Sequence, residues 1–579
     1  MLNGHLFQTK HSNDFNNIMP EAIKDYPWYK NYPEGIPRDI NPDQYSSVME
    51  LLEISFEKYK DAEAFECMGK VYSYAEIDKM SRNFAAYLQT LGLQKGDRIA
   101  LQMPNLLQYP VALFGAIRAG LITVNTNPLY TAREMEHQFK DSGAKAIIIL
   151  SNFAHNLEKI IDNTDIEHVI VTDIADLLTG FKRPLVNFVV KNVKKMVPAY
   201  NLPGAVKFSK ALKIGAASTY TKPRIALEDV GFLQYTGGTT GVSKGATLSN
   251  RNLVANVVQN LAWSKGFLEE GGEVVITALP LYHIFAFTIN CLQVVVIGGK
   301  NVLITNPRDM TGFLKEISKH PFTFITGVNT LFNGMLNHPD IDKVDFSHLK
   351  LSAGGGMAVQ VAVNERWKAK TGCAIVEGFG LSETSPVLTM NPFNGTDRIG
   401  TIGMPAPSTY VAIMDDDGNE VPVGERGEIC AKGPQVMRGY WGREADTAKV
   451  FHEGGWFRTG DIGVMDEDGF FKIVDRKKDM ILVSGFNVYP NEIEDVVVRH
   501  EGVLEVAAIG IPDPKSTEAV KICVVKKDPN LTKEELVAFC RKELTGYKVP
   551  KHVEFMDDLP KSNVGKILRR KLREQVLKG

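Results

Sequence analysis

The stretch Tyr235–Gly245, with the sequence YTGGTTGVSKG, holds four glycines, three threonines and one lysine in eleven residues. Glycine lets the backbone turn tightly and approach a ligand closely. Successive N–H groups in such a turn form a concavity that binds anions. The threonine hydroxyls add donors, and Lys244 adds a positive charge. The stretch therefore predicts a phosphate-holding loop and not a flexible linker, because linkers seldom place a lysine between glycines with apolar flanks.

This loop does not follow the P-loop of ordinary NTPases, in which Gly-Lys is followed directly by Ser or Thr. Here Val242 and Ser243 separate Gly241 from Lys244, and Gly245 comes after the lysine. The spacing argues against a kinase-type phosphate site. A phosphotransferase or NTPase stays open as an alternative from another class, and release of phosphate instead of pyrophosphate would identify it.

The loop lies within a regular alternation of strands and helices. An apolar run at 230–234 precedes it, and a helix is predicted at 250–263. Further strands are predicted at 98–103, 121–125, 144–150, 168–172, 274–279, 301–305, 322–326 and 349–352, with helices at 46–59, 75–91, 106–119 and 132–142 and between the later strands. Such alternation predicts parallel sheets covered by helices on both faces. The predicted fold class is α/β, with two doubly wound subdomains.

The length of 579 residues predicts several domains, since a single core stops growing at ~250–300 residues. Residues 1–45, rich in asparagine, proline and aromatics, predict a mostly irregular leader. Residues 46–477 form the predicted large domain, and within it the turn-rich region 396–475 predicts a small β-rich subdomain. Residues 478–579 predict a small, mobile α/β domain. A charge run at this boundary fits a hinge near Lys478.

The composition is that of an ordinary soluble globular protein, with 44% hydrophobic and 23% charged residues. A net charge of −2 gives no field that would recruit nucleic acid. The six cysteines lie far apart without metal or redox spacing, which predicts reduced thiols in the cytosol. No stretch reaches the ~18 apolar residues that span a bilayer, so any membrane contact is expected to be peripheral.

One basic segment, residues 182–197 (KRPLVNFVVKNVKKMV), interrupts the first α/β region. It carries five basic residues, no acid and several large apolar side chains. On a helix the apolar and basic sides partly separate, and such a helix can lie on an anionic membrane surface. A basic helix packed on its own domain is the alternative. The sequence thus predicts a cytoplasmic protein with optional peripheral contact at the inner membrane surface.

Two further clusters follow predicted strands. The stretch EGFGLSETSP at 377–386 comes after a predicted strand at 373–376, so it is expected at the carboxyl end of a parallel strand, where ligands bind. Phe379, flanked by glycines, could lie against a nucleobase, and Glu383 could hold a divalent cation. The triple glycine in SAGGGM at 352–357 permits close approach to a flat ring.

Three polar stretches near the end of the chain are ambiguous when taken singly. Asp461, in the turn TGD, fits either a turn cap or a carboxylate that accepts both ribose hydroxyls. The charge run that begins at Asp475 fits either a solvated face or a hinge. Lys566, which follows a glycine in a polar turn, fits either a loop lysine or a functional one.

Together these stretches resemble the adenylate-forming enzymes, which include acyl-CoA synthetases, luciferases and the adenylation domains of peptide synthetases. The matching motifs stand in the family's order and are Tyr235–Gly245, Leu279–Phe285, Glu377–Glu383, Gly427–Pro434, Thr459–Asp461, Asp475–Pro490 and Pro560–Lys566. The chain is most similar to bacterial long-chain fatty-acid–CoA ligases, through Phe486–Glu494 and Tyr282–Phe285. The family usually has tyrosine and threonine where Phe379 and Ser382 stand, so the ring and the hydroxyl are kept.

The resemblance implies a ligase that uses ATP, Mg²⁺ and CoA in two steps. A fatty-acid carboxylate first attacks the α-phosphate of ATP and gives an acyl-adenylate and pyrophosphate. The CoA thiolate then attacks the adenylate and gives the thioester and AMP. By motif position, the phosphates would be held by Tyr235, Thr236, Gly237, Gly238, Thr239, Thr240, Gly241 and Lys244. Thr239 and Glu383 would be the magnesium ligands.

The remaining implied roles concern the nucleotide and the acyl group. The nucleotide pocket would be formed by Gly354, Gly355, Glu377, Gly378, Phe379, Gly380 and Ser382, with Asp461 and Arg476 on the ribose. Lys566 would bridge the acyl carboxylate and the α-phosphate. His283 would form a lid near the carboxylate, and Tyr235 or Phe287 would gate the acyl tunnel. Rotation about Lys478 would remove Lys566 and bring the Gly485 segment to the CoA channel.

The same resemblance leaves rival substrates open. An aryl- or medium-chain-CoA ligase shares the ATP site, as does a fatty-acyl-AMP ligase that loads a carrier protein. A catalytically silent homologue is a third alternative, although Glu383, Asp461 and Lys566 are all present. The sequence leaves the oligomeric state open, with a homodimer as one option, and it does not decide the preferred acyl chain length.

Overall fold

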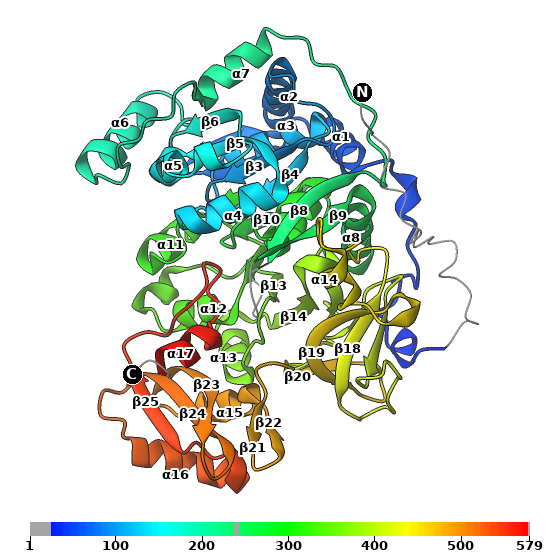
Figure 1. Ribbon diagram of the computed structural model, residues 1–579, viewed down its shortest axis with the longest axis vertical. Helices are drawn as coiled ribbons and strands as arrows, with labels where there is room; N and C mark the ends of the chain where they lie inside the picture. Colours follow the sequence, from blue (N-terminus) through cyan, green and yellow to red (C-terminus); the bar gives the residue numbers. More distant parts are fainter. Residues whose placement is uncertain (1–24, 237–242, 577–579) are drawn as a thin grey trace.

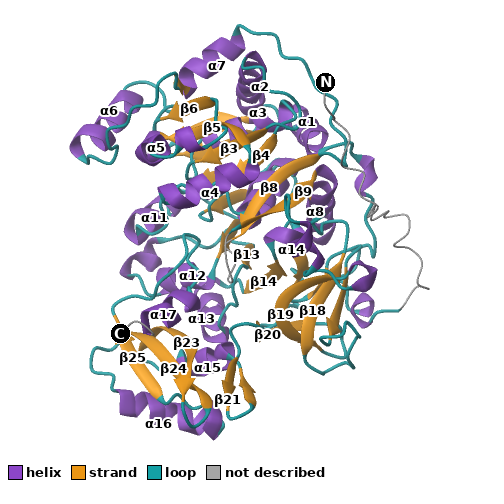
Figure 2. Ribbon diagram, in the orientation of Figure 1, coloured by secondary structure: helices purple, strands orange, loops and turns teal. Residues whose placement is uncertain are grey.

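The computed structural model describes residues 25–236 and 243–576, and within these ranges the strands form four sheets (Figure 1). The two largest sheets are mostly parallel and are covered by helices, whereas two smaller sheets form the β-rich region of the large part and the small C-terminal part (Figure 2). The predicted fold class is thus confirmed: an α/β chain with a large N-terminal part, which includes a β-rich region, and a small C-terminal part.

The first parallel sheet has the strand order β7-β6-β5-β3-β4-β8-β9, and only β8 and β9 pair antiparallel. Its strands are β3 (Arg98–Gln102), β4 (Ile122–Asn125), β5 (Ala144–Leu150), β6 (His168–Thr172), β7 (Val206–Lys207), β8 (Val230–Thr236) and β9 (Lys244–Ser249). Its helices are α2 (Tyr74–Thr90), α3 (Gln108–Arg118), α4 (Ala132–Ser142), α5 (Ala154–Glu158), α6 (Lys182–Phe188) and α7 (Phe208–Ala216). Strand β8 leads directly into the predicted phosphate loop.

The second sheet has the order β16-β15-β14-β13-β12-β10-β11-β1-β2, parallel from β14 to β1. Its strands are β1 (Glu63–Cys67), β2 (Lys70–Ser73), β10 (Val274–Thr277), β11 (Lys300–Leu303), β12 (Phe324–Gly327), β13 (Leu351–Gly354), β14 (Ile375–Gly380), β15 (Val387–Met390) and β16 (Met404–Pro405). Its helices are α1 (Val48–Lys58), α8 (Asn250–Trp263), α9 (Ile284–Ala286), α10 (Val294–Val296), α11 (Met310–Ile317), α12 (Asn329–Leu336) and α13 (Val361–Thr371).

The β-rich subdomain is a four-stranded antiparallel sheet, and a five-stranded sheet forms the small C-terminal part. The former contains β17 (Tyr410–Met414), β18 (Gly427–Lys432), β19 (Phe457–Met465) and β20 (Phe471–Arg476), with α14 (Glu444–Ala448) beside it. The latter contains β21 (Ile481–Val483), β22 (Phe486–Val488), β23 (Val503–Asp513), β24 (Thr517–Lys526) and β25 (His552–Met556), with α15 (Pro490–Val497), α16 (Lys533–Glu543) and α17 (Arg569–Val576).

Local capping signals explain why several predicted bounds agree with the structure. Helix α4 begins behind Thr131, whose side chain forms a reciprocal capping box with Glu134, and it ends at Gly143 in the left-handed region. Helix α8 begins behind Ser249, which forms the same kind of box with Asn252. Strand β5 follows Gly143 directly. Each of these elements has the bounds expected from the sequence.

The predicted leader is described from residue 25. Its described part is irregular apart from the short 3₁₀ segments Pro27–Lys30 and Pro42–Gln44. It is nevertheless packed firmly, since Trp28 is fully buried. Figure 1 shows this blue segment running beside the yellow β-rich subdomain. An irregular backbone therefore does not make this segment a free tail.

The small C-terminal part contacts the large part through hydrogen bonds around α12 and through ion pairs elsewhere, such as Arg569 with Asp475 at 3.1 Å and Arg426 with Glu492 at 3.3 Å. The hydroxyl of Thr330 donates to the carbonyl of Gly565 at 3.0 Å, and the amide of Asn333 donates to the carbonyl of Leu504 at 3.0 Å. A charged donor, Arg308, lies 3.4 Å from the carbonyl of Ser562. These contacts hold the segment that carries Lys566 against the second sheet.

The basic segment predicted to be amphipathic forms α6, which continues as a π-helical turn over Val189–Val193. Neither of these helical turns contains a buried residue. Figure 1 shows α6 at the outer edge of the molecule, beyond α5. Among the described helices, none combines the length and the apolar character that crossing a membrane requires.

Candidate functional site

A cavity of about 920 Å³ lies where the first sheet, the second sheet and the C-terminal segment meet. Most of the predicted site residues line it: Tyr235, Thr236, Lys244, His283, Gly354, Gly355, Glu377, Gly378, Phe379, Gly380, Ser382, Glu383, Arg476, Lys478 and Lys566. The predicted phosphate-loop residues Gly237, Gly238, Thr239, Thr240 and Gly241 lie outside the described residues. The chain thus brings together residues more than three hundred positions apart.

Gly354, Gly355, Gly378 and Gly380 line one part of this cavity, which we call the slot. At Gly380 a Cβ would lie 1.8 Å from the carbonyl of Pro386, so only glycine fits there. At Gly355 a Cβ would lie 3.2 Å from the carbonyl of Gly378, which would require a small shift of that neighbour. The slot thus presents bare backbone, which suits contact with a flat ring.

The aromatic cluster lies inside a strand and not after it, which corrects one expectation. Strand β14 pairs with β13 in parallel as far as Glu377. From Gly378 onward it pairs antiparallel with β15, so the backbone stays extended through Gly380. Phe379 is therefore held by ladder hydrogen bonds at the cavity wall. The turn back into β15 could not be read from the apolar pattern alone.

Glu377 presents one carboxylate oxygen that lacks a partner. Its Oε2 atom accepts a hydrogen bond from the backbone N–H of Val359 at 2.9 Å. Its Oε1 atom is buried and has no hydrogen-bond partner among the described residues. Burial raises the pKa of this carboxyl to about 8. A buried acceptor facing a cavity is suited to a ligand N–H donor.

Asp461 and Arg476 face each other across β19 and β20. Arg476 Nε lies 3.1 Å from Asp461 Oδ1. The second oxygen of Asp461 is buried and has no hydrogen-bond partner within residues 25–236 and 243–576. Asp461 does not itself line the cavity wall, whereas Arg476 does. The pair leaves one carboxylate oxygen available for a donor such as a ribose hydroxyl.

Glu383 is buried behind β14, and its carboxylate is oriented by a tyrosine. The hydroxyl of Tyr440 donates to Glu383 Oε1 at 2.9 Å. Burial raises the pKa of Glu383. Lys244 lies over the ring of Tyr440, 5.2 Å from its centroid, and forms an ion pair of 3.0 Å with Asp446. Since Lys244 is already paired, it is a weaker candidate for a catalytic cation than Lys566.

Lys566 enters the cavity from a tight turn of the C-terminal segment. The N–H of Ser562 donates to the carbonyl of Lys566, the N–H of Lys566 donates to the hydroxyl of Ser562, and Gly565 supplies the left-handed conformation (φ +82°) between them. Burial and the nearby positive charge of Arg476 lower the pKa of Lys566 to about 7. No hydrogen bond or ion pair from the described residues holds its ammonium group. It is therefore available to a negatively charged ligand.

His283 lies at the start of α9, where its Nδ1 atom accepts a hydrogen bond from the backbone N–H of Phe285 at 3.3 Å. Burial, aided by the charge of Lys566, lowers the pKa of His283 to about 4. The imidazole is thus neutral at physiological pH. Since Nδ1 accepts, Nε2 carries the proton and can only donate. His283 is a donor beside the cavity and not a general base.

One side of the cavity is apolar. We call this region the apolar arm and define it by Leu268, Ile289, Phe324, Leu351, Val376, Met390 and Phe393, which line the cavity and belong to one hydrophobic cluster. A channel with such walls is suited to a hydrocarbon chain, because burying apolar surface is favourable by roughly 25 cal/mol per Å². The sequence did not reveal this arm, since its residues come from seven separate elements or loops without shared spacing.

Phe287 and Tyr235 have other environments than a gate would need, and Gly485 lies where it is expected before rotation. Phe287 is fully buried against Phe232, with ring centroids 4.8 Å apart, and it does not line the cavity, so it is not a gate. Tyr235 lines the cavity, but its hydroxyl donates to Asp141 at 2.8 Å, which fixes the ring to the wall. Gly485 lies in the exposed turn between β21 and β22, outside the cavity.

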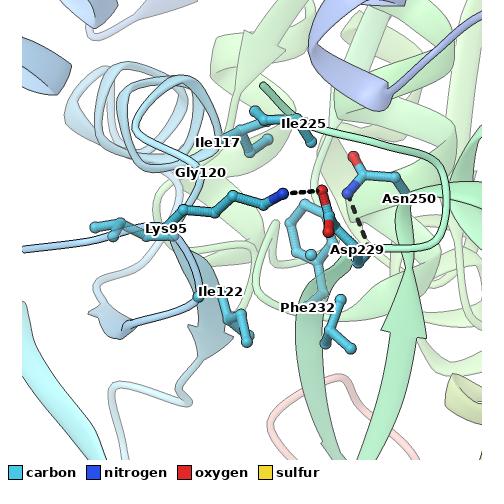
Figure 3. Close-up of a pocket in the computed structure, with 12 residues that line it drawn as sticks. Lys95, Ile117, Gly120, Ile122, Ile225, Asp229, Phe232 and Asn250 are labelled. Atoms are coloured by element: carbon cyan, nitrogen blue, oxygen red, sulfur yellow. Dashed lines mark hydrogen bonds and ion pairs between the residues drawn. The ribbon is translucent and has the colours of Figure 1, made fainter. Parts of the chain in front are cut away.

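A second, smaller cavity lies at the opposite end of β4 and β8 (Figure 3). Its volume is about 290 Å³. Lys95 and Asp229 close it with an ion pair of 2.6 Å, and the amide of Asn250 donates to the carbonyl of Asp229 (Figure 3). Its polar groups are satisfied by one another. It therefore presents no free charge to a ligand.

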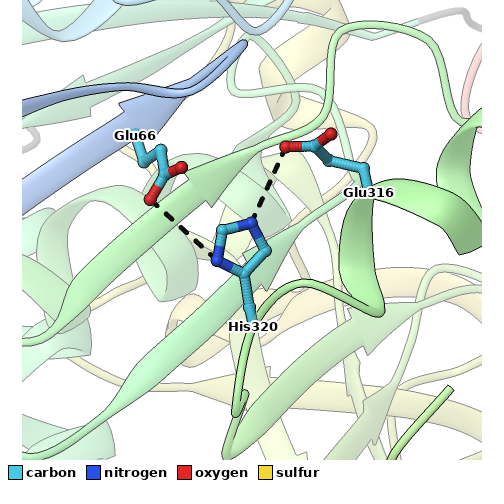
Figure 4. A group of neighbouring side chains, drawn as sticks. All are labelled: Glu66, Glu316 and His320. Atoms are coloured by element: carbon cyan, nitrogen blue, oxygen red, sulfur yellow. Dashed lines mark ion pairs between the residues drawn. The ribbon is translucent and has the colours of Figure 1, made fainter.

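Glu66, Glu316 and His320 gather between β1 and α11 in an arrangement that resembles metal ligation (Figure 4). The ammonium of Lys300, however, lies 2.6 Å from Glu66 Oε2, the oxygen that is 4.0 Å from His320 Nδ1. A resident lysine cation already compensates this carboxylate. We therefore interpret the group as an ion-pair network that ties β1, β11 and α11 together.

Comparison with known proteins adds independent information. The model of the AMP-binding enzyme family matches residues 52–441, and that of the AMP-binding enzyme C-terminal domain matches residues 492–566. The chain is 60% identical over 549 residues to the long-chain-fatty-acid–CoA ligase of Escherichia coli O6:H1, covering 95% of this chain and 98% of the relative. It is 35% identical over 509 residues to the feruloyl-CoA synthase of an Amycolatopsis species, covering 88% and 94%. The structure of ATP-bound MatB from Rhodopseudomonas palustris superposes with a TM-score of 0.76 at 28% identity, covering 91% of this chain and 98% of MatB.

Proposed function

This chain belongs to the AMP-binding enzyme family, and on that premise we propose that it is an ATP-dependent long-chain fatty-acid–CoA ligase. One observation carries the proposal: a single cavity joins a glycine-lined slot to an apolar arm, and Lys566 lies in the same cavity. The identity of 60% to a long-chain ligase, against 35% to a feruloyl-CoA synthase, favours long chains over aryl acids.

In the first step a carboxylate oxygen of the fatty acid attacks the α-phosphorus of ATP. The bond from that phosphorus to the bridging oxygen breaks, and pyrophosphate leaves. Negative charge builds up on the phosphate oxygens in the transition state. Lys566, whose ammonium has no protein partner among the described residues, is placed to stabilise that charge. His283 is suited to donate from Nε2 to an acyl carboxylate oxygen.

The nucleotide would be bound by groups that are otherwise left unsatisfied. Phe379 and the glycines of β13 and β14 would enclose the adenine, and Glu377 Oε1 would accept from its amino group. Asp461 Oδ2 would accept from a ribose hydroxyl. The carboxylate of Glu383, oriented by Tyr440, fits a magnesium ligand. Magnesium bound there would neutralise phosphate charge, and the predicted partner ligand Thr239 lies outside the described residues.

In the second step the sulfur of CoA attacks the acyl carbonyl of the adenylate. The carbon–oxygen bond to AMP breaks, the thiol proton goes to solvent and AMP leaves. We propose that the part of the chain after Lys478 rotates between the steps. That rotation would withdraw Lys566 and bring the turn at Gly485, which lies outside the cavity here, to the thiol. The positions of Lys566 and Gly485 correspond to the first step.

The function is tested by incubating the protein with ATP, Mg²⁺, CoA and acids of graded length, and by measuring thioester and pyrophosphate. Palmitate is expected to react with a kcat/KM above those of octanoate and coumarate, since burying each added methylene contributes about 0.8 kcal/mol to binding. Preference for coumarate or octanoate would favour the aryl- or medium-chain alternative. Adenylate formation without thioester would favour a fatty-acyl-AMP ligase.

We further propose that the protein is cytoplasmic and contacts the inner membrane surface through α6 and the turn after it, which we call the basic helix (residues 181–196). Five large apolar side chains are exposed here: Phe181 (76%), Leu185 (53%), Phe188 (57%), Val193 (64%) and Met196 (52%). Lys182, Arg183, Lys191, Lys194 and Lys195 accompany them. Apolar side chains beside basic ones fit an anionic bilayer surface.

Membrane binding is expected to fall when the apolar side chains of the basic helix are removed. The double variant Phe181→Ser/Phe188→Ser should sediment less with phosphatidylglycerol vesicles than the parent protein, because it buries less apolar area. Val423→Ser removes an exposed apolar residue (49%) from another surface and should bind as the parent does. Removal of one lysine should weaken binding about fivefold at low salt, since each is worth ~1 kcal/mol. Equal sedimentation of all variants would contradict the proposal.

The assembled state is a separate question. A homodimer is the arrangement we propose to test, by light scattering of the purified protein with and without ATP. A mass near 64.2 kDa would instead indicate a monomer.

A further inference from the structure

The N-terminal segment Tyr26–Ile36, which we call the strap, is fixed to the β-rich subdomain. Trp28 is fully buried, stacks on Tyr26 at 4.3 Å and contacts Phe471 at 6.0 Å between ring centroids. The amide of Asn31 donates to the carbonyl of Asp468 at 2.7 Å. The strap thus has a defined position although its backbone is irregular.

Tyr32 connects the strap to the second sheet. Its ring meets Trp263 edge to face, with centroids 5.2 Å apart and an interplanar angle of 82°. Its hydroxyl donates to the carbonyl of Pro405 in β16 at 2.5 Å. Burial raises the pKa of this hydroxyl, so it stays a donor throughout the physiological range. Both ends of the side chain are therefore anchored.

Trp263 carries this contact to the wall of the apolar arm. It is the last residue of α8, 2% exposed, and its Nε1 atom donates to the carbonyl of Asn391 at 3.1 Å. Asn391 directly follows Met390 and precedes Phe393 by two positions, and both of these side chains line the arm. On the other side of Trp263 the chain continues to Leu268, which also lines the arm.

The strap and the arm share one hydrophobic cluster. That cluster contains Trp28 and Trp263 together with the arm residues, and Tyr26, Tyr29 and Tyr32 pack against it. Phe393 is braced in addition by Phe267, with ring centroids 5.6 Å apart. Leu268 forms an isolated bridge with Lys265, and its N–H donates to the carbonyl of Ser264 at 3.0 Å, so its loop is fixed to the end of α8 beside Trp263. The position of both loops therefore follows that of Trp263, which contacts Asn391 directly.

We propose that the strap, through Tyr32 and Trp263, positions the loops that close the apolar arm and thereby sets the acyl chain length that the enzyme accepts. This inference rests on the proposed function, because it assigns a specificity role within the same cavity. Tyr32 is a positioning residue: it does not line the cavity but acts through Trp263. Loosening it should allow the loops at Leu268 and Phe393 to retreat and admit longer chains.

The test compares kcat/KM for laurate, palmitate and arachidate in the full-length protein. Tyr32→Ala should raise the ratio of kcat/KM for arachidate to that for laurate about 10-fold, through a lower KM for arachidate. Contacts of a pocket with one or two methylenes change kcat/KM by about this factor. The KM for ATP should stay as in the parent protein. Tyr32→Phe keeps the ring against Trp263 and should keep the parent ratio. Where the alanine variant does not fold, Tyr32→Leu replaces it with the same expected direction.

Tyr26→Ala is the matched control, because Tyr26 stacks on Trp28 and not on Trp263. It should lower the melting temperature and leave the ratio of the acids unchanged. A uniform loss for all acids in Tyr32→Ala, or an equal change of ratio in Tyr26→Ala, would overturn the positioning role. Absence of any thioester from the parent protein would instead overturn the proposed function, so the two failures are distinguishable.

Discussion

Replacement of Lys566 by alanine is expected to lower the rate of acyl-adenylate formation by about 10²–10³-fold, the effect of losing one preorganised contact to transition-state charge. Formation of thioester from supplied acyl-AMP and CoA should stay near the parent rate, because the second step does not use this ammonium. The measurement is pyrophosphate release in a single turnover, set beside thioester formation from synthetic palmitoyl-AMP. An unchanged rate of adenylation would show that Lys566 has another role.

The pH dependence gives the same residue a second readout. Burial and Arg476 lower the pKa of Lys566 to about 7, so the charged form predominates below that pH and is lost as pH rises. The kcat/KM for ATP in the first step should therefore decline above about pH 7. Bound phosphate stabilises the charged ammonium of Lys566, so the decline of kcat should occur at a higher pH than the decline of kcat/KM. The guanidinium of Lys566→Arg stays charged, so an active Lys566→Arg variant should not show this decline of activity with rising pH.

Replacement of Lys478 by proline is expected to impair the second step much more than the first. Proline fixes φ near −65° and so restricts the rotation that the small part of the chain must make. Lys478 lies in a turn where the N–H of Asp479 donates to the carbonyl of Arg476 at 3.0 Å. Misplacement of the CoA site should slow thioester formation by about 10²-fold, while adenylate formation changes little.

Lys478→Ala is the control for this hinge, because it removes the charge and leaves the backbone free to rotate. Burial lowers the pKa of Lys478 to about 8, and its side chain lines the cavity, so alanine is expected to affect nucleotide binding alone. Rapid-quench measurement of both steps separates the two variants. If proline slows both steps equally, the rotation axis does not lie at residue 478.

The fold followed from local chemistry wherever the signals were local. The capping boxes at Thr131 and Ser249 and the left-handed Gly143 gave exact bounds for α4, β5 and α8. Gly354, Gly355 and Phe379 could be proposed as nucleotide-binding residues because each lies in a glycine-rich stretch next to a predicted strand. Lys566 and Asp461 required a resemblance to a family, since a lone lysine or aspartate in a turn has no distinctive pattern.

The features that the sequence did not predict all depend on contacts between distant segments. Tyr440 orients Glu383 from 57 positions away, and nothing in either stretch signals the other. Phe287 is an aromatic residue of the kind that could gate a tunnel, but it packs against Phe232 and belongs to the hydrophobic core. Strand β14 continues through Phe379 only because β15 turns back beside it. Periodicity describes one element at a time and cannot show these pairings.

The small C-terminal part is held against α12 by the hydroxyl of Thr330, the amide of Asn333 and the side chain of Arg308. The two neutral hydrogen bonds among these contribute only about 0.5–1.5 kcal/mol each. The attachment around α12 is therefore weak, and this side of the docked arrangement is expected to open once the negative ligand around Lys566 departs. Bound pyrophosphate is then expected to stabilise the arrangement in which the small part is docked. Its loss before CoA reacts would impose an obligatory order of product release: pyrophosphate first, and AMP with the thioester last.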